Sequence, residues 1–177
     1  MPQFLQAVAV LLCLLVIVGD FYQRRVRNQW LVAALLLGLG WLIWFWTRQT
    51  AVPLVTAMMG LAIGLAVLLP FYIGGLMGAG DVKFFATLGF LLGGKALLPI
   101  WIIGSLLGGV HAVVILVSRY LMGYPGLGFA GLQIRVTESR LWQHVLVARN
   151  GRKGLPYAAY MAIGGLLTMF FTTLTHW

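Results

Sequence analysis

The chain has 177 residues, of which 62% are hydrophobic and only 8% are charged. A soluble domain carries about 25% charged residues, so this chain cannot cover a water-facing surface, and its composition places it in a lipid bilayer. Its formal charge of +9 does not by itself exclude a nucleic-acid partner. However, the chain has no basic motif that alternates with solvent-facing aromatic residues. We therefore expect no nucleic-acid partner, and expect the positive charge to face anionic lipid.

Apolar runs of helical length follow one another along the whole chain. A helix needs roughly 20 apolar residues to cross the hydrocarbon core. We predict an all-α, polytopic membrane bundle of six transmembrane helices, forming one domain over residues 1–177. The predicted spans cover residues 4–19, 30–46, 52–73, 82–92, 96–117 and 156–174. The fourth is short, and it either extends backwards through residues 74–80 or begins partway into the membrane.

Basic residues are divided unevenly between the two sides that six spans create. Cytoplasmic loops carry the excess of lysine and arginine, so we predict that the richer side is cytoplasmic and that both termini lie outside. A long cytoplasmic loop is predicted over about residues 119–154, and its part 137–149 has the pattern of an amphipathic helix on the inner leaflet. The richer side holds Arg24, Arg25, Arg27, Lys83, Arg119, Arg135, Arg140, Arg149, Arg152 and Lys153, and the other holds Arg48 and Lys95.

The chain contains only three acidic residues, Asp20, Asp81 and Glu138. Ionisable groups at membrane depth are costly and usually functional. Asp20 closes the first predicted span and Asp81 opens the fourth from the same side, so packed helices bring both carboxyls to one depth. Two close carboxyls do not both ionise easily, and such a pair supplies a general base and a general acid. The structural alternatives are a water-solvated helix end for Asp20 and a helix cap for Asp81.

Other candidate ligand groups are sparse. The single Cys13 permits neither a disulfide framework nor a Cys-x-x-Cys metal pair, and the histidines His111, His144 and His176 are widely dispersed. We expect no metal site and no cofactor. His111, inside the fifth predicted span, is interpreted as a satisfied interior polar group.

Three local motifs accompany the two aspartates. Asp81 lies in Gly78-Ala79-Gly80-Asp81-Val82-Lys83, a Gly-x-Gly-Asp-Val-Lys motif, and Asp20 is followed by Val26-Arg27-Asn28. The last predicted span opens with Pro156-Tyr157-Ala158-Ala159-Tyr160-Met161-Ala162. Together with the six-span layout, these motifs resemble the type IV prepilin peptidases, which are polytopic aspartyl proteases. Arg27 and Ala158 stand where that family usually has proline and glycine.

The resemblance implies a membrane aspartic endopeptidase that removes the leader peptide from a prepilin or pseudopilin precursor. Cleavage would occur at the cytoplasmic face of the bacterial inner membrane, for pilus assembly or type II-like secretion. The chain is similar to the compact, protease-only members associated with tight-adherence (Flp) pili, without the region linked to methylation. The implied catalytic residues are Asp20 and Asp81, and the implied supporting residues are Gly78, Gly80, Lys83, Asn28, Pro156 and Tyr157.

Glu138 is the one acid outside the pair, and we take it as a candidate contact for the basic leader, with an ordinary solvated loop acid as the alternative. Two other functions stay open. A proton-coupled transporter would also use paired intramembrane acids, but it predicts further polar groups along the spans, where almost none occur. A non-catalytic membrane assembly factor with the same fold is compatible with the changes at Arg27 and Ala158.

Overall fold

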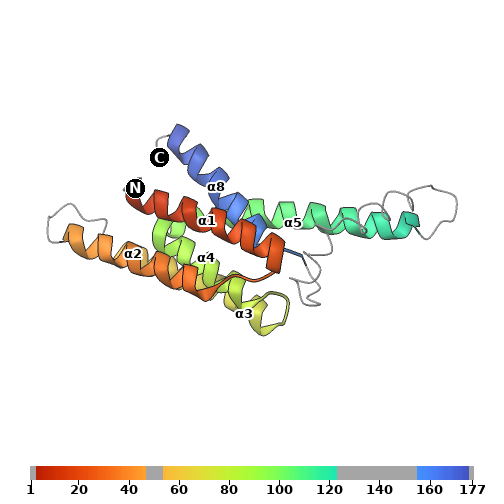
Figure 1. Ribbon diagram of the computed structural model, residues 1–177, viewed down its shortest axis with the longest axis horizontal. Coiled ribbons are helices and arrows are strands. Elements are labelled where there is room, and N and C mark those ends of the chain that lie inside the picture. The colour runs from red at the N-terminus through yellow and green to blue at the C-terminus, as the bar shows by residue number, and fades with distance from the viewer. Residues whose placement is uncertain (1–2, 47–53, 123–154, 176–177) are drawn as a thin grey trace.

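The computed structural model describes residues 3–46, 54–122 and 155–175, and the regular structure in these ranges is entirely helical. Figure 1 shows the helices gathered into an elongated bundle, with α5 extending past the others at one end. The helices are α1 (Gln3–Gln23), α2 (Asn28–Trp46), α3 (Leu54–Ile73), α4 (Ala79–Leu92), α5 (Gly94–Met122) and α8 (Tyr157–Thr175). The all-α prediction is therefore confirmed for the described residues.

Each predicted span corresponds to one helix, with shifted ends. Helix α1 continues four residues past the predicted end at Gly19, so Asp20 lies inside the helix. Helix α5 runs on to Met122, which moves the start of the predicted loop 119–154. The remainder of that loop, including Glu138 and the amphipathic segment 137–149, lies outside the described residues.

Three helices are long and apolar enough to cross a membrane: α1, α3 and residues Gly94–Ser118 of α5. Helices α2 and α8 carry shorter apolar segments, Asn28–Trp44 and Tyr157–Phe171. These segments mark a membrane protein. Six crossings and the placement of the termini stay predictions.

Helix α4 forms the centre of the bundle. It begins at Ala79 rather than extending back through residues 74–80, and its 14 residues span about 21 Å, less than the roughly 30 Å of the hydrocarbon core. Within 82–92 every residue except Lys83 is buried, because α4 contacts α1, α2, α3, α5 and α8. A helix that is apolar on all sides belongs in such an interior.

Small residues allow the other helices to approach closely. The backbones of Gly60 in α3 and Gly89 in α4 are in contact, and a side chain on either glycine would overlap the other helix. A Cβ atom on Gly164 of α8 would lie 2.8 Å from the carbonyl oxygen of Ile100 in α5. Close backbone approach at small residues is the usual way in which helices associate in membranes.

A Schellman turn ends α3 near the start of α4. Gly75 takes a positive φ of 70°, and the Leu76 amide donates to the Phe71 carbonyl at 3.0 Å, which satisfies an otherwise unpaired helix-end carbonyl. The turn directs the chain back toward Gly78, where α4 begins. One end of the bundle thus collects the end of α3 and the start of α4.

Candidate active site

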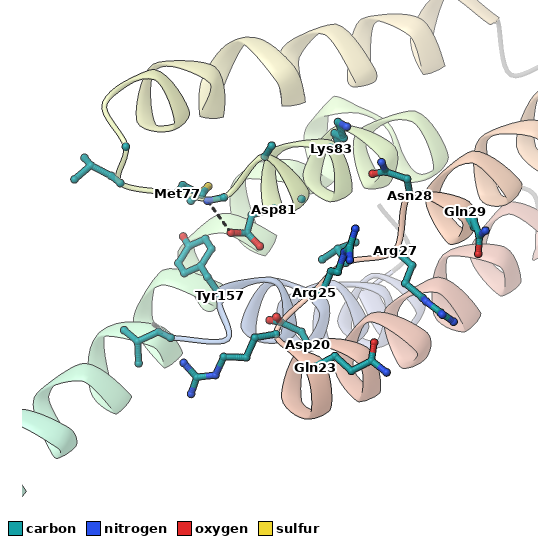
Figure 2. A pocket seen from close by; sticks show the side chains of 18 residues that line it. Asp20, Gln23, Arg25, Arg27, Asn28, Gln29, Met77, Asp81, Lys83 and Tyr157 are labelled. Atoms are coloured by element: carbon teal, nitrogen blue, oxygen red, sulfur yellow. Dashed lines mark hydrogen bonds between the residues drawn. The ribbon is translucent and has the colours of Figure 1, made fainter. Parts of the chain in front are cut away.

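A cavity of about 1200 Å³ lies where the ends of α1 and α3 meet the starts of α2, α4 and α8. This exceeds the roughly 300–1,000 Å³ of sites for small molecules, so it has room for a segment of polypeptide. Figure 2 shows Asp20 and Asp81 on different walls of this cavity. Its lining residues are Asp20, Gln23, Arg24, Arg25, Val26, Arg27, Asn28, Gln29, Gly75, Leu76, Met77, Gly78, Ala79, Gly80, Asp81, Lys83, Leu155 and Tyr157.

Asp20 is contributed by the inward face of α1. It follows Cys13 and Val16 at the spacing of one helical face, and like them it is buried, with 7% of its surface exposed. One carboxylate oxygen, Oδ2, accepts a hydrogen bond from the Ala159 amide at 3.0 Å. The Asp20 carboxyl is therefore not solvated by water, as it would be if Asp20 only ended the helix at the membrane surface.

Asp81 lies in the first turn of α4. Its Oδ2 accepts a hydrogen bond from the Gly78 amide at 3.2 Å, so Asp81 does cap the helix, from the third helical position rather than from the N-cap, which is Gly78. A Cβ atom on Gly80 would lie 3.3 Å from Val26 Cβ. The absence of a side chain at Gly80 lets the segment after α1 pack against the start of α4.

The start of α8 reaches both aspartates through consecutive backbone amides. Ala159 donates to Asp20, and the neighbouring Ala158 amide acts on Asp81, where it lowers the pKa of the carboxyl. The first amides of a helix have no acceptor within it, and the positive end of the helix dipole favours a negative charge there. Sequence reasoning missed this contribution, because a backbone amide leaves no signature in the side chains.

The electrostatics of Asp81 favour a bound proton. Asp81 lies outside the three candidate membrane spans. Burial raises the pKa of the Asp81 carboxyl above its ordinary value, and the nearby charge of Asp20 raises it further, while hydrogen bonds from the Gly78 and Ala158 amides act in the opposite direction. The net effect is upward, so one carboxyl of this pair retains its proton more readily than an isolated aspartate.

The predicted supporting residues gather at the same place. Gly78, Gly80, Lys83, Asn28 and Tyr157 all line the cavity, whereas Pro156 is buried just before α8 and does not line it. The Tyr157 hydroxyl shares a hydrogen bond of 2.8 Å with Ser105 Oγ of α5, which fixes the ring on the cavity wall. Ser105 carried no signal in the sequence, since an isolated serine in an apolar helix is common.

The remaining polar candidates lie apart from the two aspartates. A ring nitrogen of His111 lies 2.6 Å from the Tyr160 hydroxyl in a hydrogen bond, so the histidine is satisfied as expected. The side chain is exposed, so its interpretation as an interior group is wrong. Within the described ranges, His, Cys, Asp and Glu residues form no cluster of three or more that could hold a metal ion.

Comparison with known families gives one match. The sequence model of the type IV leader peptidase family matches residues 7–113, more than half of the chain, and this range includes both aspartates of the cavity. Searches of curated proteins and of solved structures find no match. The extent of the family match shows that this chain belongs to the type IV leader peptidase family.

Proposed function

We propose that this chain is a membrane aspartic endopeptidase that removes the leader from a prepilin or pseudopilin precursor. One observation carries the proposal. Asp20 and Asp81, two of the three acids in the chain, come from different helices to line one cavity. Membership of the leader peptidase family supports the same reaction.

The two carboxyls divide the chemistry between them. In the working state one is ionised and the other protonated, because close carboxyls do not ionise together easily. The ionised carboxyl takes a proton from a water molecule as the water oxygen attacks the scissile carbonyl carbon, and the protonated carboxyl donates its proton to the carbonyl oxygen. The first carboxyl then protonates the leaving nitrogen, the second recovers a proton from the diol, and the C–N bond breaks.

We propose that the cavity faces the cytoplasm, in a six-span arrangement with both termini outside, in the bacterial inner membrane. Arg24, Arg25, Arg27 and Lys83 surround the cavity, while Lys95 lies at the opposite end of α4, next to the start of α5. This distribution agrees with the excess of positive charge on cytoplasmic segments. An apolar helix of the precursor would lie in the bilayer while its cleavage site enters the cavity, in the service of pilus assembly or type II-like secretion.

The test is to co-express the chain with a cognate precursor and follow leader removal on a gel. Asp20→Asn and Asp81→Asn keep the shape of each side chain but remove its acid–base function. Each is expected to lower processing by at least about 100-fold, with membrane insertion unchanged. Lys95→Gln, a charge removal at the far end of α4, should process normally. Normal processing by either asparagine variant would exclude the proposed pair.

A further inference from the structure

The cavity carries more positive than negative charge. Four cationic side chains line it, against two carboxyls, one of which holds a proton in the proposed working state. The guanidinium of Arg27 lies over the Trp30 ring at 5.7 Å. The four cations are Arg24, Arg25, Arg27 and Lys83.

Arg24 has an unusual backbone conformation. Its φ of 49° is the only positive value at a non-glycine residue among those described. Its amide donates to the Asp20 carbonyl at 3.0 Å, which ends α1 in a left-handed cap of the kind that normally uses glycine or asparagine. An arginine there costs about 1–2 kcal/mol, and strain of this size is characteristically kept at functional positions.

The side chain of Arg24 has an unused donor. Its Nε atom is buried and has no hydrogen-bond partner. A buried donor without an acceptor is unfavourable, and a guanidinium is shaped to bind a planar oxyanion through two parallel hydrogen bonds. Backbone strain and an unpaired donor thus occur together at a residue that lines the cavity one helical turn from Asp20.

We propose that Arg24 binds a carboxylate that the precursor carries near its cleaved bond, and that this contact selects the segment that enters the cavity. The inference rests on the proposed function. A turn of helix rises about 5.4 Å and an extended residue spans about 3.3 Å, so the carboxylate lies within a few residues of the cleaved bond. The basic leader is repelled by the same cations, which leaves it outside the cavity. A lipid phosphate is the competing anion, but it would occupy the space that the precursor needs.

The experiment uses the purified full chain in phosphatidylcholine vesicles and synthetic precursor peptides. Each peptide has a lysine-containing leader ending in glycine, followed by an apolar helical segment. A single glutamate is placed in turn at each residue near the cleaved bond, with a glutamine peptide as its match. The unsubstituted chain is expected to show, at one position, a KM about tenfold lower for glutamate than for glutamine, as for one charge-assisted hydrogen bond.

Arg24→Asn removes the charge but suits the left-handed conformation, so the fold should be retained, with a melting temperature equal to or above the original. It should raise KM for the glutamate peptide to that of the glutamine peptide, with a much smaller change in kcat. Lys95→Gln, outside the cavity, should leave both KM values unchanged.

The possible results separate the two proposals. Equal cleavage of every glutamate and glutamine pair by the unsubstituted chain would overturn the role of Arg24 and leave the peptidase proposal intact. A loss in Arg24→Asn that is the same for both peptides would also overturn it. Dependence on added phosphatidylglycerol, with no preference for glutamate, would assign Arg24 to lipid instead. Cleavage of no peptide would remove the proposed function and this inference with it.

Discussion

At Asp81, opposing influences act on one carboxyl. Burial and the neighbouring Asp20 favour the neutral acid, while the Gly78 and Ala158 amides favour the charged form. The pKa is raised overall, which suits a group that must hold a proton at a pH where an ordinary aspartate has lost it. Because the two carboxyls interact, the titration steps belong to the pair rather than to either residue alone.

A bell-shaped pH dependence of kcat is therefore expected. As the pH falls through the lower apparent pKa, both carboxyls become protonated and the base is lost. As the pH rises through the upper apparent pKa, both ionise and the acid is lost. Because the pKa of Asp81 is raised, the alkaline limb should lie above the ordinary aspartate value of about 3.9. The measurement is kcat for one peptide across pH in phosphatidylcholine vesicles, and a rate that only rises with pH would indicate a single base instead.

The two departures from the prepilin peptidase pattern also have local explanations. Ala158 is completely buried and contributes its backbone amide to Asp81, which an alanine supplies as well as a glycine. Arg27 lies on the exposed rim of the cavity with its guanidinium over Trp30. Neither change replaces a group that the proposed reaction uses.

Among the helices, the crossing of α3 and α4 holds the start of α4 in place. The helices run in opposite directions, since Gly60 lies against Gly89 and Gly64 against Ala86. This contact continues toward Gly78 and Asp81 at the cavity, so its geometry determines where the Asp81 carboxyl is presented.

Gly60→Ala should destabilise the protein, because its Cβ atom would overlap the Gly89 backbone. Overpacking of this kind costs about 1–3 kcal/mol. Gly40→Ala is the matched control in α2, where a Cβ atom would meet nothing within 4 Å, and it should be neutral or stabilise by up to about 1 kcal/mol. Thermal unfolding in detergent compares the two, and equal melting temperatures would contradict the close crossing.

Across the whole molecule, the cavity lies at one end of the bundle, which makes its orientation in the membrane decisive for function. Asp20 near the end of α1 contacts Ala159 at the start of α8, and Cys13 lies against Gly165. Helices α1 and α8 are therefore antiparallel, and Figure 1 shows the N and C labels at the same end of the bundle. The start of α1 and the end of α8 thus lie at the end of the bundle away from the cavity.

Site-directed labelling tests the proposed orientation. The only cysteine, Cys13, is buried and is replaced by alanine before single cysteines are introduced at the exposed positions Arg25 and Lys95. Arg25→Cys should react with a membrane-impermeant maleimide only from the cytoplasmic side, and Lys95→Cys only from outside. The opposite pattern, or labelling of both positions from one side, would refute the proposed topology.

Local patterns determined the helical class, the approximate helices and the choice of Asp20 and Asp81 as the pair to examine. Apolar runs show the helices because each must satisfy its backbone internally in lipid, and acids in such a chain are conspicuous because they are costly there. The Gly-x-Gly-Asp segment also predicted a helix start at Asp81, which the Gly78 hydrogen bond explains.

The tertiary structure alone decided how these groups meet. It shows that α4 is short and central, that amides of Ala158 and Ala159 reach both carboxyls, and that Arg24 adopts a left-handed conformation beside the cavity. These features depend on backbone geometry and on contacts between residues distant in the chain. The order of side chains along the sequence shows neither the backbone geometry nor these contacts, because one motif is compatible with many different helix packings.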